Sequence, residues 1–481
     1  MTRAGAGASL TETVMNTVRQ QIAARSLVPG ARLPSIRAFA RTMGVSTFTV
    51  AEAYDRLAAE GAIRARPGSG FYVAAPLAPL ALAEIGPRLD REIDPLWIAR
   101  QSLEAGENLL MPGCGWLPAD WLPQDAIRRG LRALARGSDA ALAEYGTPLG
   151  LPGLRELVAR RLARYGVAAP PGQILLVDSG SHAIDLLCRF LIEPGDTVLL
   201  DDPCHFNFHA LLRAHRAKVV GIPFTPAGPD LDSFAEALSN HRPRLYITNS
   251  AVHNPTGACL SAPTAHRLLQ LCHGRDLTII EDDIFADFED EPTPRLAALD
   301  GLDRVVQIGS FSKTLSAAAR CGYIAARPDW IDGLTDLKIA TSLGSGHLAA
   351  GLTLTLLTGS AYRRHVEALR LRLARARGET MTRLRQIGLE PWIEPRAGMF
   401  LWCRLPQGLD AADIARRALA SGVILAPGNA FSQAQTAAGF LRFNVAQSGD
   451  PKVFAVLAEA MADAAGPIPR RAPAPAPRHR P

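Results

Sequence analysis

Lysine is scarce in this chain of 481 residues. Of its 52 basic residues, only Lys218, Lys313, Lys338 and Lys452 are lysines, and the other 48 are arginines. A lysine beside a candidate functional motif therefore stands out against the composition. Aromatic residues are also few, at 6%, whereas apolar residues reach 48% and charged residues 20%. This balance provides for a sizeable core and excludes a disordered or fibrous protein.

The seven cysteines are scattered, and none forms a Cys-x-x-Cys pair. This absence argues against a disulfide framework and against a zinc site, and it predicts reduced thiols in a cytosol. Long apolar runs are also missing, because the two longest stretches without charged residues, 339–362 and 418–441, are interrupted by glycine and polar residues. The N-terminal residues show no apolar region of the kind that signal peptides have. We therefore expect a soluble, cytoplasmic protein with no membrane span and no metal site.

The net charge of +6 is unevenly distributed along the chain. Residues 1–74 hold nine arginines against four acidic residues, and residues 466–481 hold four arginines and no acid. The first segment therefore carries +5 and the last +4, which leaves −3 for residues 75–465. A basic head on a slightly acidic body indicates that the head meets a polyanion. On charge alone, a basic domain without such a partner is the alternative.

Composition divides the chain into four parts. Residues 1–74 form the predicted head, 75–95 a linker, 96–465 a large body, and 466–481 a tail of proline, alanine and arginine. This organisation agrees with the roughly two to four domains that such a length provides for. The low complexity of the tail predicts a disordered or extended segment.

The head has the pattern of a winged helix-turn-helix domain. Apolar residues at helical spacing predict a first helix that Pro29-Gly30 ends, a second between Ser35 and Gly44, and a third between Ser46 and Gly61. Residues 62–73 then predict a two-stranded wing. Residues 46–49 begin the third helix, the recognition helix, where side chains are able to enter a major groove.

The body alternates short apolar runs with helical segments. The runs are 174–177, 197–200, 218–222, 245–248, 277–280 and 304–308. Most contain β-branched residues, as buried strands do. The pattern predicts an α/β fold around a mostly parallel central sheet, and such sheets bind ligands at the carboxyl ends of their strands.

The head also contains an ordered set of motifs. They are Leu33-Pro34-Ser35-x-Arg37, Gly44-Val45-Ser46, Thr49-Val50, Ala53-Tyr54 and Arg66-Pro67-Gly68-Ser69-Gly70. With these motifs the head resembles the winged helix-turn-helix domain of the GntR family of transcription regulators. The resemblance implies contacts with double-stranded DNA from Ser35, Arg37, Ser46, Thr47, Thr49, Arg66 and Gly70. Hydroxyl groups and helix N-termini suit phosphates, and arginine suits a bidentate contact with guanine.

The recognition helix departs from this family at two positions. Between Ser46 and Thr49 the GntR family usually carries Arg-Asn, whereas this chain has Thr47 and Phe48. The usual arginine contact with a base is thereby lost, although Phe48 is able to pack against a thymine methyl group. Two alternatives remain for the head. Either Arg37 and the arginines of the wing pair only with acidic residues of the head, or the head no longer binds DNA.

The body carries a second ordered set of motifs. Lys313 lies in Gly309-Ser310-Phe311-Ser312-Lys313-Thr314, just after a predicted strand, and Arg320-x-Gly322-Tyr323 follows. Upstream are Ser179-Gly180-Ser181-His182, His253-Asn254-Pro255-Thr256-Gly257 and Asp282. Taken singly, each is an ordinary turn, strand-end or surface feature. In this order they resemble the motifs of fold-type I aminotransferases, which use pyridoxal 5′-phosphate (PLP).

The resemblance implies a cofactor site. Lys313 supplies the amine that forms a Schiff base with the cofactor aldehyde. A buried carboxylate at Asp282 keeps the pyridine nitrogen protonated, and Asn254 bonds the phenolic oxygen. The groups implied at the cofactor phosphate are Ser181, His182, Ser310 and Arg320.

Four more positions follow from the same resemblance. His205 stands where the family usually stacks an aromatic residue on the cofactor ring, and Arg442 matches the arginine that clamps a substrate carboxylate. Tyr145 matches a tyrosine that reaches the phosphate of the neighbouring subunit, which implies a homodimer. For Arg442 and Tyr145, ordinary ion pairing or core packing is the alternative. Phe285 replaces a tyrosine that bonds the phenolic oxygen, so we expect cofactor binding with at most a residual transamination half-reaction.

A GntR-like head joined to an aminotransferase-like body resembles the MocR branch of the GntR regulators. The resemblance implies a PLP-dependent homodimer that binds operator DNA and senses an amine, an amino acid or PLP itself. Two other functions remain open. One is an active PLP-dependent aminotransferase with a vestigial DNA-binding head, and the other is a DNA-binding protein with an inactive body.

Overall fold

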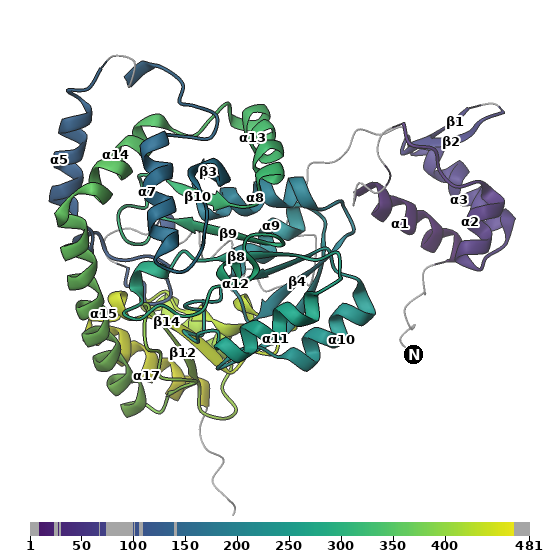
Figure 1. Cartoon of the computed structure of the whole chain (residues 1–481). Helices are drawn as coiled ribbons and strands as arrows, with labels where there is room; N and C mark the ends of the chain where they lie inside the picture. The colour runs from purple at the N-terminus through teal and green to yellow at the C-terminus, as the bar shows by residue number, and fades with distance from the viewer. Residues whose placement is uncertain are drawn as a thin grey trace, which may run out of the picture. The chain divides into compact units, whose positions relative to one another are not determined.

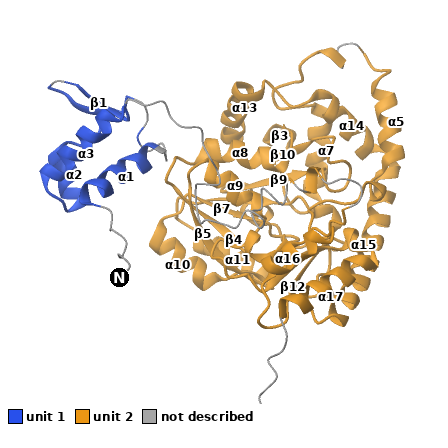
Figure 2. Ribbon diagram, turned by 180° about the vertical axis from the view of Figure 1, so that it is seen from behind, with its two compact units in different colours: residues 1–88 blue, residues 89–481 orange. Residues whose placement is uncertain are grey.

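The chain forms two compact units, residues 1–88 and 89–481 (Figure 2). The computed structural model describes residues 9–23, 27, 30–66, 68–73, 100, 102–104, 109–138 and 142–465. The expected linker at 75–95, the expected tail at 466–481, and Pro29 and Pro67 of the head motifs lie outside the described residues. The division between the two units falls within that linker.

The described part of the head contains three helices and a two-stranded antiparallel wing. They are α1 (Leu10–Ala23), α2 (Ile36–Met43), α3 (Thr47–Ala59), β1 (Ile63–Arg66) and β2 (Gly70–Val73). The hydroxyl of Ser35 accepts a hydrogen bond from the Ala38 amide at 3.2 Å where α2 begins. Gly44, with a φ of 63°, ends that helix. These boundaries agree with the helix-turn-helix predicted from the sequence.

The apolar sides of the head elements form one core. Its buried members include Val14, Val18, Phe39, Val50, Tyr54, Leu57, Ile63 and Val73. Because the core draws on α1, α2, α3 and both strands of the wing, it fixes α3 against the rest of the head. The opposite side of α3 is left to solvent.

An eight-stranded mixed sheet forms the centre of the second unit (Figure 1). Its spatial order is β3 (Ile174–Val177), β10 (Gly322–Ala325), β9 (Val305–Ser310), β8 (Thr278–Asp282), β7 (Leu245–Thr248), β4 (Thr197–Asp202), β5 (Lys218–Thr225) and β6 (Gly228–Pro229). The strands from β9 to β5 are parallel, whereas β10 runs antiparallel to both β3 and β9, and β6 runs antiparallel to β5. The mostly parallel sheet expected from the apolar runs is therefore present.

Two of the strands extend further than their apolar runs indicate. The sequence places Asp282 just after a run that ends at residue 280, whereas the ladder pairs Asp282 with Ile308 and makes Asp282 the last residue of β8. Ser310 likewise ends β9, where it pairs with Gly322. Polar residues continue these strands because the backbone ladder, and not the apolar side chains, holds their last residues.

Helices cover both faces of this sheet. Along β4, Leu199 contributes to one apolar cluster, and Val198 and Leu200 contribute to the other. The first cluster includes residues of α7 (Pro152–Ala163), α10 (Leu231–His241), α11 (Ala262–Cys272), α12 (Leu296–Asp300) and α14 (His347–Thr358). The second includes residues of α8 (Gly180–Leu191), α9 (Phe206–Ala214) and α13 (Pro328–Ser342). The result is a three-layer α/β arrangement.

A smaller sheet follows in the chain. Its order is β11 (Glu390–Pro391), β12 (Phe400–Arg404), β14 (Phe440–Asn444) and β13 (Ala426–Pro427). It packs in a separate core with α15 (Ser360–Gln386), α16 (Ala411–Ala420) and α17 (Pro451–Ala465). The remaining described elements are α5 (Gln124–Leu134), η3 (Ala119–Trp121), η4 (Pro171–Gln173), η5 (Ala286–Phe288), η6 (Gly428–Phe431) and η7 (Val445–Gln447). Over the described ranges, no helix combines the length and apolar character that a membrane crossing requires.

Candidate functional site

A cavity of about 130 Å³ lies at the carboxyl ends of the central strands. Its lining comprises Gly115, Ser179, Gly180, Ser181, His205, Phe208, Asn249, Asn254, Asp282, Ile284, Phe285, Ser310, Ser312, Lys313 and Arg320. The fold thus brings together seven of the residues that sequence analysis assigns to a cofactor: Lys313, Asp282, Asn254, Ser181, His205, Ser310 and Arg320. Their roles toward a cofactor stay predictions.

Lys313 follows β9 and its side chain is half-buried at the cavity. Its Nζ donates a hydrogen bond to the Gly115 carbonyl at 2.6 Å. Burial, with the nearby Arg442 guanidinium, lowers the pKa of the Lys313 ammonium to about 8. The neutral, nucleophilic form of this amine is therefore more accessible near neutral pH than that of an ordinary lysine.

Asp282 ends β8 between its neighbours β7 and β9, and its side chain is buried. One carboxylate oxygen accepts a hydrogen bond from the Ile284 amide at 3.1 Å. Burial raises the pKa of this carboxyl to about 7, against the opposing effects of that hydrogen bond and of Lys313. A cationic ring nitrogen placed beside it would favour the carboxylate, so this residue fits the partner of a protonated pyridine.

Hydroxyl groups, an arginine and the N-terminus of α8 surround one end of the cavity. Ser181 accepts a hydrogen bond from Asn207 at 3.0 Å, and the hydroxyl of Ser310 donates to the Cys321 carbonyl at 3.1 Å. A Cβ on Gly322 would lie 2.8 Å from the Gly309 carbonyl oxygen and 3.0 Å from the Ser179 carbonyl carbon. Only glycine allows β10 this close to the start of α8. The grouping suits a dianionic phosphate.

His182 and Tyr145 are not among the residues that line this cavity. The His182 amide donates to the Ser179 hydroxyl at 3.0 Å, and its ring lies 3.3 Å from the Asp178 carboxylate. The His182 amide thus serves the cap at the start of α8, and the phosphate contact expected of His182 stays a prediction. Tyr145 is 83% exposed, which leaves its ring accessible to a second subunit and rules out the core-packing alternative.

Arg442 on β14 is buried without an acidic partner among the described residues. Its guanidinium donates to Asn254 at 2.9 Å and to the Gly113 carbonyl at 2.6 Å, between the rings of Phe400 and Phe431. Its Nε has no hydrogen-bond partner within the described part of the chain. Burial lowers the pKa of Arg442 to about 9. Arg442 is not among the residues that line the cavity, but it is hydrogen-bonded to Asn254, which is one of them. This buried cation fits a ligand carboxylate.

His205 and Phe285 complete the wall of the cavity. Burial, with the charges of Lys313 and Arg442, lowers the pKa of His205 to about 3, so its ring is neutral, and its Nδ1 has no partner among the described residues. Phe285 packs edge-on against Phe400 with ring centroids 5.7 Å apart. The residues present therefore fit PLP, except that no hydroxyl stands at position 285.

A second polar cluster lies directly behind Lys313, and sequence analysis missed it. The Asp287 carboxylate accepts a hydrogen bond from Thr314 at 3.2 Å and is also bonded by Tyr362 and Arg161. The hydroxyls of Thr314 and Tyr362 lie 3.0 Å apart. The cluster thereby ties the residue after Lys313 to η5, α7 and α15. No sequence signal reveals it, because its members are far apart in the chain.

Asn249 is another residue that sequence analysis missed. Its side-chain amide donates to the Asp282 carbonyl at 2.5 Å, and its oxygen accepts from the Asn254 amide at 2.9 Å. Asn249 therefore fixes the distance between two candidate cofactor residues. It follows the strand run 245–248, and this position at a carboxyl strand end is the signal that could have identified it.

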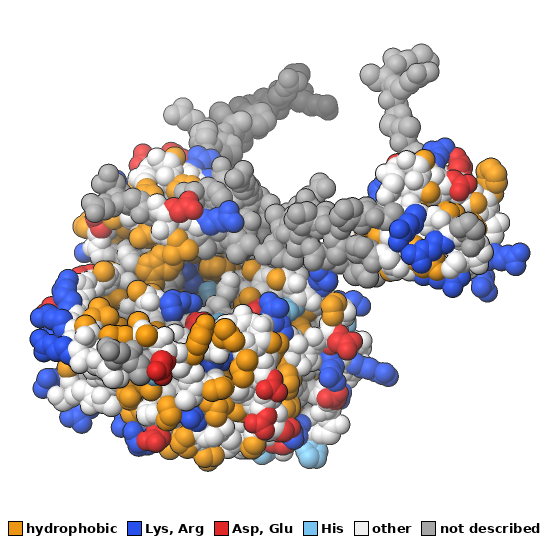
Figure 3. Space-filling view, turned by 90° about the horizontal axis from the view of Figure 1, so that it is seen from above, with side chains coloured by type: hydrophobic (Ala, Val, Ile, Leu, Met, Phe, Trp, Pro, Cys, Tyr) orange, Lys and Arg blue, Asp and Glu red, His pale blue; other side chains and the backbone are white. Residues whose placement is uncertain are grey.

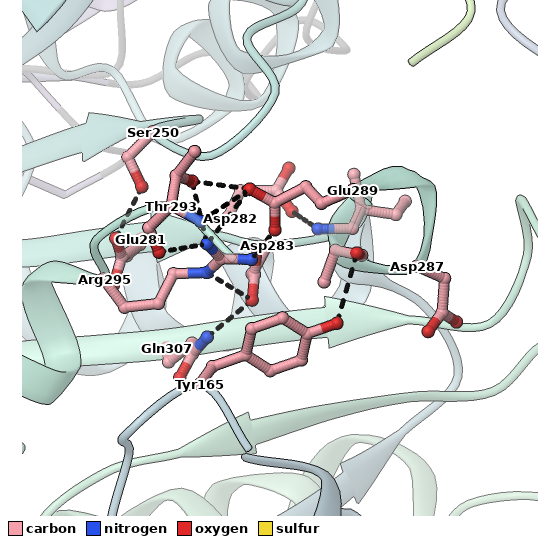
Figure 4. A network of polar contacts seen from close by, with 12 residues as sticks. Tyr165, Ser250, Glu281, Asp282, Asp283, Asp287, Glu289, Thr293, Arg295 and Gln307 are labelled. Atoms are coloured by element: carbon pink, nitrogen blue, oxygen red, sulfur yellow. Dashed lines mark hydrogen bonds and ion pairs between the residues drawn. The ribbon is translucent and has the colours of Figure 1, made fainter. Parts of the chain in front are cut away.

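A buried ion network lies beside the cavity (Figure 4). Arg295 forms ion pairs with Asp283 at 3.0 Å and with Glu289. Glu281 accepts hydrogen bonds from the backbone at the start of α12 and from Ser250 at 2.5 Å. Because Glu281 and Asp283 flank Asp282 in the chain, the network fixes the end of β8 that bears the candidate ring partner.

The head presents a basic surface at the start of α3. Ser46 caps this helix by accepting the Thr49 amide at 3.0 Å. Arg37 and Thr47 line a shallow hollow, together with Ala40, Arg41, Gly44 and Val45. In the part of the chain that the structure describes, Arg37 forms no ion pair, which argues against the alternative that it serves an acid of the head. Arginine side chains gather on the face of the head seen in Figure 3.

The wing carries the remaining candidate DNA residues. Arg66 on β1 stacks on the Tyr72 ring, with its guanidinium carbon 4.4 Å from the ring centroid. Gly70 begins β2 with a φ of 103°, a conformation that other residues rarely adopt. Both residues are exposed, as are Ser35, Ser46 and Thr47. Their contacts with DNA stay predictions.

Comparisons with known proteins match both units. Residues 10–73 match the family of bacterial regulatory proteins of the gntR type, and residues 117–461 match aminotransferase class I and II. The HTH-type transcriptional regulator YdcR of Escherichia coli is 30% identical over 89% of this chain and 93% of its own length. The probable rhizopine catabolism regulatory protein MocR of Rhizobium meliloti is 30% identical over 85% of this chain and 84% of its own. These matches confirm both resemblances drawn from the motifs.

Among solved structures, the body is similar to LysN, an α-aminoadipate aminotransferase of Thermus thermophilus. The two share 26% identity and a TM-score of 0.70, over 76% of this chain and 95% of LysN. That structure is complexed with N-(5′-phosphopyridoxyl)-L-leucine. The similarity confirms the fold-type I architecture of the body.

Asp282→Asn is expected to stabilise the cofactor-free protein while weakening its retention of PLP. Because the folded protein binds the Asp282 proton more tightly than the unfolded chain does, this carboxyl lowers stability as the pH rises from about 4 to about 7. The variant should therefore melt a few degrees above the unaltered protein at pH 8 and show a smaller gain at pH 5. Added PLP should raise its melting temperature less. Equal melting behaviour at both pH values, or unaltered PLP retention, would contradict the role of Asp282.

Proposed function

The chain belongs to the MocR-type transcription regulators, in which a GntR helix-turn-helix domain precedes an aminotransferase class I and II domain, and from this premise we propose that its DNA binding responds to PLP and an amine at Lys313. The observation that carries the proposal is the cavity that joins a lysine of lowered pKa to a buried aspartate, in a chain that also has a DNA-binding head. The proposed operator is double-stranded DNA, and the proposed assembly is a homodimer with two heads.

Each residue of the cavity has a task in this proposal. PLP, when bound, supplies an aldehyde and an electron-withdrawing ring. Lys313 would hold the cofactor through its neutral amine, and Asp282 would keep a proton on the ring nitrogen. The start of α8, with Ser310 and Arg320, binds the phosphate.

The geometry around Arg442 indicates the class of effector. Arg442 donates to Asn254, and Asn254 lines the cavity. A ligand carboxylate at Arg442 would compete for this hydrogen bond, so ligand binding and the position of Asn254 are linked. We therefore propose an amino acid as effector, with another amine or PLP itself as alternatives that titration distinguishes.

Signalling requires that the effector prefer one arrangement of the protein over another. The cluster of Asp287, Thr314 and Tyr362 connects the lysine loop to α15, and α15 packs in the core of the smaller sheet that carries Arg442. An amino acid held at both Lys313 and Arg442 would therefore act on two parts of the body at once. We propose that the resulting closure alters the freedom of the two heads.

An active aminotransferase is the second candidate. The retention of Lys313, Asp282, Asn254 and Arg442 favours it. Phe285 disfavours it, because a phenyl ring has no hydroxyl to donate to the phenolic oxygen. Steady conversion of an amino acid and a keto acid, unaffected by changes in the head, would support this candidate over the regulator.

Arg37→Ala is expected to weaken operator binding by about tenfold or more, because loss of a bidentate contact costs about 1–3 kcal/mol. Duplexes are first selected from random DNA with the unaltered full chain. Affinity is then measured by fluorescence anisotropy at fixed salt, with and without PLP. Arg19→Ala is the matched control, because Arg19 is on α1 and pairs with Glu60 at 2.8 Å.

The two variants should behave differently. Arg19→Ala should retain most of the affinity, and equal losses in the two variants would argue against a specific role for Arg37. An affinity that PLP and amines leave unchanged would exclude sensing through the body while leaving DNA binding intact.

A further inference from the structure

Phe48 lies at the start of the recognition helix, and 76% of its surface is accessible. It is the second residue of α3, after Ser46 caps the helix and Thr47 begins it. An α-helix turns by about 100° per residue, so Phe48 lies opposite the side formed by Val50 and Leu57. Those two residues are fully buried in the core of the head. The phenyl ring therefore contributes nothing to that core and projects from the surface.

A hollow that contains two arginines includes Thr47, the residue before Phe48. Arg37, Arg41 and Thr47 line the hollow at the start of α3, and neither arginine forms an ion pair among the described residues. An exposed ring on a helix whose start adjoins two arginines without ion pairs is complementary to a polyanion with apolar groups between its charges. Duplex DNA has this character in its major groove.

We propose that Phe48 reads a thymine by packing on its 5-methyl group, an inference that rests on the DNA binding proposed above. The phenyl ring has no hydrogen-bond donor, so it does not read the guanine acceptors O6 and N7. Among the four bases, thymine alone carries a methyl group in the major groove. Phe48 lies at the N-terminal end of the helix, where recognition helices contact base edges. The chain thereby selects its operator by an apolar contact at this position.

The test removes the methyl group from the DNA and the ring from the protein. Duplexes selected by the unaltered full chain are remade with each thymine in turn replaced by deoxyuridine, which pairs identically and lacks the methyl group. We expect one replacement in each half-site to weaken binding about three- to fivefold, the value of one buried methyl group. In Phe48→Ala the same replacement should leave the affinity unchanged, because the two changes remove the same contact.

Two further variants serve as controls. Leu10→Ala removes another exposed apolar side chain of the head, 64% accessible on α1, and should retain the methyl dependence. Phe48→Leu keeps an apolar side chain and should retain part of the dependence on the thymine methyl group. Circular dichroism and gel filtration establish that each variant is folded and has the same oligomeric state.

The outcomes separate this inference from the proposed function. If deoxyuridine has no effect at any position, or the same effect in Phe48→Ala, then thymine reading by Phe48 is wrong while DNA binding stands. If no duplex is selected, the proposed DNA binding fails and the inference fails with it. If Phe48→Ala changes the oligomeric state and the methyl group has no effect, Phe48 faces protein and the inference is overturned.

Discussion

Lys313→Ala is expected to abolish the Schiff-base absorption band that the protein forms with PLP when no amine is added. Alanine has no amine to attach the cofactor, and the lowered pKa of Lys313, about 8, provides the neutral amine in the unaltered chain. PLP retention should also fall, because the covalent link is lost while the phosphate and ring contacts stay. Absorption spectra after gel filtration of protein mixed with PLP measure both effects.

Because lysines are scarce in this chain, few other side-chain amines are able to attach PLP in this experiment. Lys452 on α17 and Lys218 on β5 are exposed, so Lys452→Ala and Lys218→Ala are matched controls that should keep the band. Lys313→Arg keeps the charge and should also lack the band. A Schiff-base band in Lys313→Ala without added amine would assign PLP attachment to another amine of the protein and overturn the site.

The same spectra identify the effector class when amines and amino acids are added. A compound that shifts the Lys313-dependent band and alters operator affinity is the effector. A band that no amine moves, in a protein whose operator affinity depends on PLP, makes the cofactor itself the signal. A colourless protein with unaltered operator binding would leave a DNA-binding protein with an inactive body.

The polar residues of the site could be predicted from the sequence because they lie at or just after the ends of strands. Asp282 and Ser310 end β8 and β9, and parallel strands bring their carboxyl ends to one edge of a sheet. Short apolar runs located those strands, and motifs located the polar residues after them. For the same reason the helix-turn-helix could be predicted, since Ser35, Gly44 and Ser46 are local capping signals.

Contacts between distant segments could not be read in this way. Asp287 joins Arg161, 126 positions away, to Tyr362, 75 positions away, and no local pattern relates these residues. The sequence did not indicate that the Ser179 cap uses the His182 amide, because a helix N-terminus has several amides and the local pattern does not distinguish them. The sequence also identified Arg442 as a candidate. It did not reveal that Arg442 lacks an acidic partner among the described residues, because that depends on the packing around the side chain.

The same limit applies to Arg295, for which the sequence gives no signal. Its guanidinium is fully buried between Asp283 and Glu289 and lies over the Tyr165 ring, 4.6 Å from the centroid (Figure 4). Asp283 also accepts a hydrogen bond from Gln307 at 2.8 Å. The arginine thus balances two buried carboxylates next to the candidate cofactor residue on β8.

Arg295→Met is expected to destabilise the body by about 3–5 kcal/mol, because removing one partner of a buried ion pair leaves uncompensated charge. The loss should be greater at pH 8 than at pH 5. Burial raises the pKa of Asp283 to about 7 even with Arg295 present, and loss of the guanidinium raises it further. A carboxyl whose folded pKa lies above its unfolded value is tolerated at low pH, and its contribution to stability is lost as the pH rises through that range.

Denaturant midpoints at the two pH values measure this effect. Arg385→Met is the matched control, because Arg385 pairs with Glu394 at 2.6 Å at the surface, where such pairs contribute less than about 1 kcal/mol. Two results would contradict this role of Arg295. One is a loss of stability in Arg295→Met no larger than that in Arg385→Met, and the other is a loss that does not depend on pH. Because Asp283 adjoins Asp282, the same variant should retain PLP less well at pH 8, which links the stability of this strand end to the function of the site.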